Sequence, residues 1–345
     1  MTIRVVHDGW PLIHAPLSAA ALHLRTLLAL APDEIEPILA LPVPTVTEAQ
    51  SGRVRNIASS AREAGDWQQR VLPRLAEEQK ASCIHTTQMS ASLFGKVATI
   101  VSPAEHTGAG SSRLGKSLGR GGLTRAKIAW PADLPAPTLP GSIRSLPAVT
   151  HPDFKHGHAT LPPEFALPEE FVLVHGINDH RQLVRLLESW TWAAASVGEL
   201  YPLVILGLDA ETKAFLAERL PEFHVEDSVR LMDAIDPQYL VGFYKACIAV
   251  VHPGSPVAWG SPLRHALACG KAVVAHQEPV TEAIVGSAAY LVQPDDLRSF
   301  GAAMITVVVD EKAREKLEDA SWQRASKWEA AKFQAELLKL YKGEK

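Results

Sequence analysis

The sequence predicts an α/β protein made of two doubly wound domains that face a cleft. Three observations lead to this prediction. Short apolar strands alternate with helical segments in the first part of the chain, a proline-rich run from Pro131 to Pro168 interrupts them, and the alternation then restarts. Helices placed between apolar strands are typical of βαβ units, so we expect each half to form one parallel sheet.

Length and composition agree with this prediction and exclude other classes of protein. At 345 residues the chain is long for a single core and suits two domains of ordinary size. Hydrophobic residues make up 47% and charged residues 21%, and the formal net charge of −4 argues against a general nucleic-acid binder. Cys83, Cys247 and Cys269 are widely spaced, and we expect three buried thiols in a reducing cytosol.

The pattern of apolar and basic residues bears on localisation. No apolar run is long enough to span a bilayer, and the start "MTIRVVHDGW" lacks the apolar core of a signal peptide, so we expect a cytoplasmic protein. A basic run leaves two interpretations open. It could contact lipid phosphates at the inner face of a membrane, or it could be a flexible solvated loop. This run comprises Arg113, Lys116, Arg120, Arg125 and Lys127.

The elements of the first half follow from local pattern. Ser18 can cap a helix over 18–32, in which Leu24 and Leu27 lie near one face. Expected strands are "IRVVHDG" (3–9), "IEPILALP" (35–42), "SCIHTT" (82–87) and "KVATIVS" (96–102), with a further helix around a proline at 66–81. A glycine-rich basic stretch at 106–127 precedes the proline-rich run, which we interpret as the linker.

The second half repeats the alternation more regularly. Expected strands are "EFVLVHG" (170–176), "YPLVILG" (201–207), "VRLMDAI" (229–235), "IAVVHPG" (248–254) and "KAVVAH" (271–276). Expected helices cover 181–197, 210–220, 236–247, 261–270 and 295–310, followed by a helical C-terminus at 314–342. Trp190 and Trp192 lie inside the first of these helices, so we expect them to pack rather than to form a platform for sugar stacking.

The stretch "HPGSPVAWGSPLRH" is the strongest local indication of a binding site. A strand ends and a helix begins at one sheet edge, with Ser261 as a cap and Pro262 in the first turn. The backbone amides of Gly254 and Ser255, together with the helix start, can point at an anion such as a pyrophosphate. An ordinary capped helix in an α/β sheet explains the same residues and stays open as the alternative.

The C-terminal half resembles the family 4 glycosyltransferases, which have the GT-B fold of two Rossmann-like domains. Arg181, in "LVHGINDHRQLVRLLESW", takes the place of a family lysine, and "SKWEAAKFQAELLKLYK" is similar to the family's terminal helix. The donor-side motif is matched by His252-Pro253, Trp259-Gly260, Pro262, Ala268-Cys269-Gly270 and Val273-Val274-Ala275. The likeness covers nearly the whole chain and is weaker in its first half.

The resemblance implies an organisation and an activity. It implies an acceptor-side domain over 1–165, a nucleotide-sugar domain over 166–325 and a C-terminal helix over 326–345 that crosses back to the first domain. The implied enzyme moves a hexose or deoxyhexose from a nucleotide diphosphate sugar to a glycan or lipid-linked acceptor, with retained configuration and without a metal or a cofactor. A role in bacterial surface polysaccharide synthesis agrees with this activity.

The resemblance also implies site residues. Arg181 and His106 are the implied catalytic residues. The implied donor-binding residues are Gly176, Arg181, Ala234, Gly254, Ser255, Val257, Ser261, Pro262, Leu263 and His265. His7, His14 and His85 are further candidates in loops or at strand ends.

Two positions depart from the family pattern and keep other functions open. The family carries acidic residues where Val257 and His265 stand here, so one hydrogen-bonding carboxylate is lost and the other is replaced by an imidazole. Valine would favour a less hydroxylated sugar on that face of the site. A catalytically silent GT-B protein that binds a nucleotide or a partner transferase is the competing interpretation, and a GT-B sugar-nucleotide epimerase is a third.

Overall fold

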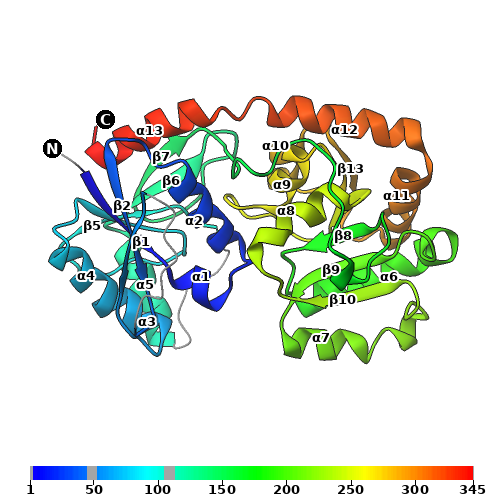
Figure 1. The fold of residues 1–345 in the computed structure, drawn as a ribbon, viewed down its shortest axis with the longest axis horizontal. Coiled ribbons are helices and arrows are strands. Elements are labelled where there is room, and N and C mark those ends of the chain that lie inside the picture. Colours follow the sequence, from blue (N-terminus) through cyan, green and yellow to red (C-terminus); the bar gives the residue numbers. More distant parts are fainter. Residues whose placement is uncertain (1–2, 45–52, 105–112, 345) are drawn as a thin grey trace. The chain divides into compact units, whose positions relative to one another are not determined.

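The chain forms two compact units, each built on its own sheet. The computed structural model describes residues 3–44, 53–104 and 113–344. The N-terminal unit comprises residues 1–152, 257–260 and 328–345, and the C-terminal unit comprises residues 153–256 and 261–327. Two α/β units confirm the predicted fold class (Figure 1). In the described part of the chain no helix is both long and apolar enough to cross a membrane.

The N-terminal unit contains a seven-stranded parallel sheet with the order β3-β2-β1-β4-β5-β6-β7. Its strands are β1 (Ile3–Asp8), β2 (Ile35–Leu41), β3 (Arg55–Ala58), β4 (Cys83–Thr86), β5 (Ala98–Val101), β6 (Lys127–Pro131) and β7 (Ser142–Leu146). Its helices are α1 (Trp10–His14), α2 (Ala19–Ala29), α3 (Ala64–Asp66), the π-turn η1 (Trp67–Val71), α4 (Leu72–Glu78), α5 (Arg113–Leu123) and α13 (Ala330–Lys342). The winding direction reverses between β1 and β4.

The C-terminal unit contains a six-stranded parallel sheet with the order β10-β9-β8-β11-β12-β13. Its strands are β8 (Val172–His175), β9 (Leu203–Leu208), β10 (Val229–Asp233), β11 (Ala249–His252), β12 (Ala272–His276) and β13 (Ala289–Val292). Its helices are α6 (His180–Val197), α7 (Ala210–Ala217), α8 (Pro237–Ala246), α9 (Pro262–Ala268), α10 (Pro279–Val285), α11 (Leu297–Val309) and α12 (Glu311–Ala325), with the short turns η2 (Pro163–Phe165) and η3 (Pro221–Phe223). The winding reverses between β8 and β11.

The central strands are buried along their whole length, which explains their unbroken apolar sequences. Every residue of β8, β11 and β12 is buried, as expected for a parallel sheet covered on both faces. Trp190 of α6 is fully buried in this core and donates its indole N–H to Ser228 Oγ at 3.0 Å. Trp192 is 52% exposed and lies against Gly301 and Arg298 at the surface, so only Trp190 packs in the core. A helix turns by about 100° per residue, so two residues further on the side chain leaves the buried face.

The proline-rich run is not the plain linker that its composition predicts. It begins within β6 and contains the whole of β7, the edge strand of the first sheet. The prolines stand outside β7, where they remove no hydrogen bond from the ladder between Ser142 and Leu146. The two units divide between Pro152 and Asp153, upstream of the sequence-based boundary at residue 165.

Candidate functional site

The predicted donor residues gather at the carboxyl edge of the second sheet. Gly176 follows β8, and Gly254 and Ser255 follow β11, the two strands between which the winding reverses. In open α/β sheets ligands bind outside the carboxyl ends of strands at such a reversal. The structure therefore brings these three residues to the place where a ligand is expected.

Two of these positions are glycines that lie close to neighbouring side chains. Gly176 has a φ of +75°, and a Cβ built there would lie 2.8 Å from Pro262 Cγ. A Cβ on Gly254 would lie 2.5 Å from Oε1 of Gln182. The Gly176 backbone thus lies against Pro262 at the start of α9, and a side chain there would push the two apart. A side chain on Gly254 would displace only the end of the flexible Gln182 side chain.

Arg181 stands in the first turn of α6, beside these loops. Its side chain is exposed, and in the described part of the chain it makes no hydrogen bond and no ion pair. The preceding helix cap is supplied by Asp179, whose carboxylate accepts the amide of Gln182 at 2.9 Å. The helix dipole disfavours a cation in the first turn, and an anion bound there would offset this cost; a solvated arginine at the helix start is the alternative.

The start of α9 differs in part from the sequence-based expectation. Ser261 occupies the N-cap position, but its side chain makes no capping hydrogen bond, and its buried Oγ has no partner among the described residues. Pro262 takes the first helical position as predicted, and Leu263 after it is fully buried. Because α9 has only seven residues, its dipole is small, and the neighbouring loop amides are the stronger donors to an anion.

His265 is enclosed by aromatic rings. It is 1% exposed, stacks on Phe154 with ring centroids 4.1 Å apart and meets the Tyr244 ring edge-on at 5.7 Å. Since α9 is so short, His265 lies in its last turn and not only near its start. This environment favours a packing role for the imidazole over direct contact with a ligand.

Three predicted residues are not part of this cluster in the C-terminal unit. Ala234 is exposed after the edge strand β10, which β9 separates from β8. Val257 belongs to the short segment 257–260 of the N-terminal unit, where Trp259 donates its indole N–H to Ala129 O at 2.9 Å and stacks on His23. His106 lies outside the described residues.

Glu278 is a residue at this edge that the sequence analysis missed. It immediately precedes α10, in the loop after β12, and its Oε2 accepts a hydrogen bond from Ser255 Oγ at 2.5 Å. An acidic residue just after an apolar strand and before a proline could have drawn attention to it. The contact with Ser255 spans 23 positions, and no local pattern predicts it.

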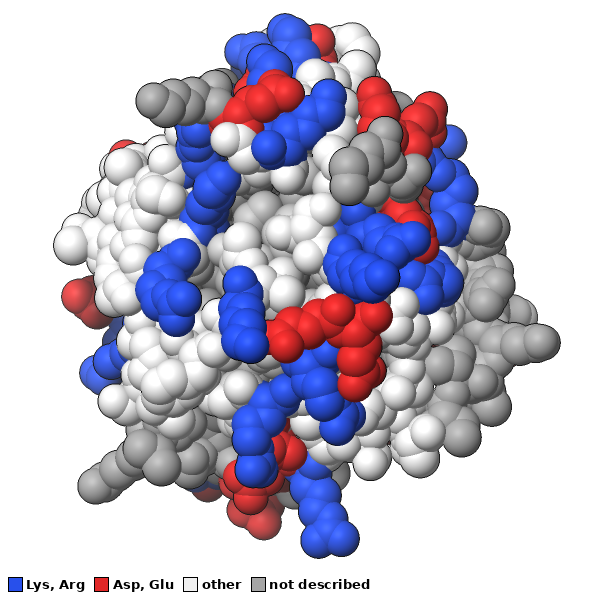
Figure 2. Space-filling model, turned by 90° about the vertical axis from the view of Figure 1, so that its left-hand side faces the viewer, with Lys and Arg blue, Asp and Glu red and all other residues white. Residues whose placement is uncertain are grey.

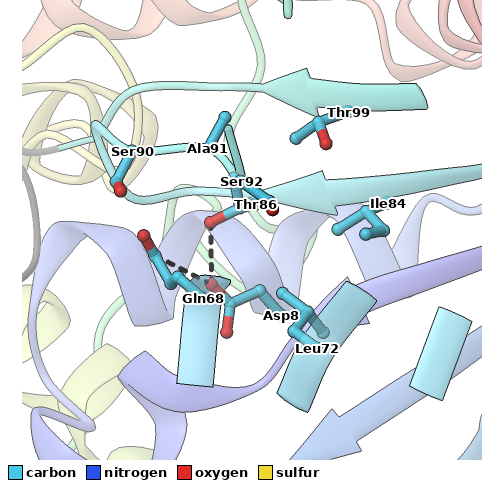
Figure 3. A pocket seen from close by; sticks show the side chains of 9 residues that line it. All are labelled: Asp8, Gln68, Leu72, Ile84, Thr86, Ser90, Ala91, Ser92 and Thr99. Atoms are coloured by element: carbon cyan, nitrogen blue, oxygen red, sulfur yellow. Dashed lines mark hydrogen bonds between the residues drawn. The ribbon is translucent and has the colours of Figure 1, made fainter. Parts of the chain in front are cut away.

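A second polar cluster lies in the N-terminal unit, at the carboxyl ends of β1 and β4. Asp8 is fully buried and accepts a hydrogen bond from Trp67 Nε1 at 2.7 Å. It accepts a second one from Thr86 Oγ1 at 2.8 Å (Figure 3). Gln68 and Gln88 complete the shell. The adjoining cavity measures only about 10 Å³, too small for a sugar. Burial raises the pKa of Asp8, and the surrounding donors work against this shift. Through these hydrogen bonds to Asp8, the cluster holds η1 and β4 against the end of β1.

Two of the three histidine candidates of the N-terminal unit, His7 and His85, form a buried group against α13. His85 binds Tyr341 Oη at 2.6 Å through Nδ1 and Ser102 Oγ at 2.7 Å through Nε2. The His7 ring stacks on His85, and neither of its nitrogens has a hydrogen-bond partner among the described residues. Burial lowers the pKa of His7 to about 3 and lowers that of His85 well below its usual value. Both imidazoles are therefore neutral, buried parts of the fold; His14 is exposed and stacks on Trp10.

The three cysteines are free and buried, as predicted. Cys247 and Cys269 line a cavity of about 240 Å³ at the amino ends of the second sheet, the edge opposite to the candidate site. Burial raises the pKa of each thiol to about 12, so neither is a thiolate at neutral pH. Among the described residues no cluster of histidine, cysteine, aspartate and glutamate could hold a metal ion.

Comparisons with known proteins agree with this architecture. The family model described as glycosyl transferases group 1 matches residues 165–324. No match was found among curated proteins.

Similar solved structures cover almost the whole chain. Sucrose-phosphate synthase from Thermosynechococcus elongatus is 17% identical with a TM-score of 0.72, covering 99% of this chain and 98% of the other. WaaG, a glycosyltransferase involved in lipopolysaccharide biosynthesis, is 12% identical with a TM-score of 0.73, covering 99% and 100%. HepE from Anabaena, in complex with UDP-glucose, is 11% identical with a TM-score of 0.71, covering 99% and 100%. At such identities the likeness shows the fold alone, and the family match covers the second domain. Residues 165–324 are thus similar to the glycosyl transferases group 1, and the whole chain has the two-domain GT-B fold of the solved glycosyltransferases.

Proposed function

We propose that this chain transfers a hexose or deoxyhexose from a nucleotide diphosphate sugar to a glycan or lipid-linked acceptor. The observation that carries the proposal is the exposed Arg181 guanidinium in the first turn of α6, beside the packed loops of Gly176 and Gly254. A diphosphate bound at this position would pair with the guanidinium, which has no partner among the described residues. The HepE structure holds UDP-glucose, which makes uridine nucleotides the first donors to test.

In the proposed reaction the diphosphate is the leaving group and gains charge as the bond to the sugar breaks. Arg181 and the amides of Gly254 and Ser255 are placed to stabilise that charge without moving during the reaction. We propose that the reaction retains the configuration of the sugar and proceeds without a metal, with Arg181 supplying the positive charge. Ser261, with its unpartnered buried hydroxyl, can donate one further hydrogen bond.

A role in bacterial surface polysaccharide synthesis, in the cytoplasm or at the inner face of a membrane, extends this proposal. WaaG is involved in lipopolysaccharide biosynthesis, which makes a lipid-linked acceptor worth testing. On the face of the N-terminal unit in Figure 2, lysines and arginines are interspersed with aspartates and glutamates. Ion pairs of this unit include Arg4 with Glu36 at 3.0 Å. Among the described residues drawn there, basic and acidic side chains are mixed, and we propose that any membrane contact depends on the acceptor.

Two measurements test the proposed activity. Calorimetry should find that UDP or another nucleoside diphosphate binds much more tightly than its nucleoside, because the site recognises the diphosphate. Equal affinities would argue that the packed loops are only structural. Slow hydrolysis of a bound donor to free sugar would then establish turnover.

The silent GT-B protein is the second candidate, favoured by Val257 and His265 in place of acidic residues. Tight binding of a nucleotide without hydrolysis or transfer, over a panel of donors and acceptors, would identify it.

A further inference from the structure

Acidic residues begin most helices that follow the strands of the C-terminal sheet, and nearly all of them are used as caps. Each accepts a backbone amide from the first turn of its own helix. The pairs are Asp179 with Gln182 N at 2.9 Å, Asp209 with Thr212 N at 2.7 Å, Asp236 with Gln238 N at 3.0 Å and Asp296 with Ser299 N at 2.9 Å. These four carboxylates cap the N-termini of α6, α7, α8 and α11, so helix capping explains why these residues are acidic.

Glu278 occupies the same position at the start of α10 but does not cap it. Its side chain makes no hydrogen bond to the helix and reaches instead to Ser255 Oγ in the loop after β11. Its other oxygen, Oε1, accepts no hydrogen bond from any described residue. The side chain is partly buried and interacts electrostatically with His276, so Oε1 is held at the sheet edge without a hydrogen-bond donor among the described residues.

The loop that carries Glu278 is fixed from both sides. The amide of Gln277 donates to Val292 O at 2.7 Å, and its side chain donates to Glu282 Oε1 at 2.7 Å. Gln293 donates to Gln277 Oε1 at 2.8 Å. Since its neighbours are bonded in this way and Ser255 holds one oxygen, the orientation of Glu278 is set before any ligand binds. Such preorganisation is typical of a recognition group.

The strand order places this carboxylate two strands away from Arg181, on the far side of the Ser255 loop. Arg181 follows β8, Ser255 follows β11 and Glu278 follows β12, and these three strands are consecutive in the sheet. A carboxylate repels a diphosphate but accepts hydrogen bonds from hydroxyl groups. The cationic end near β8 therefore suits the diphosphate, and the anionic end near β12 suits a neutral polyhydroxylated group.

We propose that Glu278 is a specificity-determining residue that accepts a hydrogen bond from a hydroxyl of the donor sugar through Oε1. This inference rests on the proposed function and names a side chain that would distinguish one donor sugar from another. It supplies a carboxylate to a donor site in which Val257 and His265 offer none. Ser255 positions it by donating to Oε2.

The test compares a nucleotide sugar with its bare nucleoside diphosphate. The probe is whichever of UDP-glucose, UDP-galactose and GDP-mannose the wild type binds most tightly. Calorimetry should give Glu278→Gln an affinity for that probe about 10- to 100-fold lower, the scale of a lost charge-assisted hydrogen bond, with the affinity for the matching diphosphate within about 2-fold. The exposed Glu188→Gln on α6 is the matched control and should leave both affinities unchanged.

Three results would overturn the inference. Equal losses for sugar nucleotide and diphosphate would make Glu278 a structural residue, tighter diphosphate binding in Glu278→Gln would place its carboxylate against the phosphates, and unchanged affinities would remove it from the site. A wild type that binds none of the probes or diphosphates would instead refute the proposed function. Thermal melting of the isosteric Glu278→Gln variant should match wild type, which separates recognition from folding.

Discussion

At the scale of single residues, Arg181 is the side chain whose position is hardest to explain without a ligand. Its exposed guanidinium opposes the dipole of an 18-residue helix and has no partner among the described residues. We predict that Arg181→Ala weakens nucleoside diphosphate binding by about 1.5–3 kcal/mol, measured by calorimetry, because a charge-assisted hydrogen bond is lost. The melting temperature should not fall. Arg298→Ala, in the first turn of α11, is the control and should keep full affinity.

A second residue-scale prediction concerns His7. Its folded pKa of about 3 lies below the unfolded value of 6.5, so the unfolded chain takes up the proton first as the pH falls. Stability is therefore fully present above pH 6.5 and decreases as the pH falls toward about 3. At pH 5 this one group should cost about 2 kcal/mol.

Denaturation of His7→Phe at pH 7.5 and pH 5 checks this sign. The variant should lose less stability on acidification than wild type does. The exposed His158→Gln is the matched control and should show the wild-type dependence. An unchanged pH dependence in His7→Phe would show that the buried imidazole is protonated in the folded chain.

At the scale of elements, the approach of the β8–α6 loop to α9 depends on Gly176. An alanine there would be strained at a φ of +75° and would place its Cβ 2.8 Å from Pro262 Cγ. We predict that Gly176→Ala destabilises the protein by about 1–3 kcal/mol and also weakens diphosphate binding, because the loops are pushed apart.

Gly286 provides a matched control for this element. Its φ is +57°, but a Cβ there meets nothing within 4 Å. Gly286→Ala should therefore have only a conformational cost, about 1–3 kcal/mol because its ψ is −124°, and should leave binding unchanged. Chemical denaturation of both variants measures the cost of backbone strain, and calorimetry measures whether displaced loops weaken diphosphate binding. Equal effects of the two substitutions on binding would contradict the close packing of the loops.

At the scale of the whole molecule, the N-terminal unit is completed by the end of the chain. Residues 328–345 belong to it, and Phe333, Leu337 and Tyr341 of α13 are buried there. We predict that removal of residues 328–345 lowers the melting transition of the N-terminal unit sharply, since burying each such side chain contributes about 1.5–3 kcal/mol. The C-terminal unit should still bind a nucleoside diphosphate.

Calorimetric scanning with and without UDP distinguishes the two units. UDP should raise the melting temperature of the C-terminal unit, which identifies its transition. In the truncated chain this transition should keep its temperature, and only that of the N-terminal unit should fall. Loss of both transitions together would show that the two units unfold as one.

The sequence by itself determined the kind of fold and the edge of the site. Buried parallel strands need apolar side chains on both faces, so β8, β11 and β12 are readable as unbroken apolar runs, and glycine and proline mark the loops after them. Arg181, Gly176 and Gly254 could be singled out because each belongs to a local strand–loop–helix pattern. The predictions for these residues as donor ligands remain to be tested.

Only the tertiary structure decided which distant residues meet. Trp259 packs with His23 and Phe333, so the segment 257–260 joins the N-terminal unit although its neighbours in sequence do not. β7 forms within the proline-rich run because its partner β6 precedes the run's main part. Glu278 turns from its own helix to Ser255. Local propensity records the preferences of neighbours along the chain, whereas these contacts depend on how the sheet orders its strands, which no short stretch of sequence encodes.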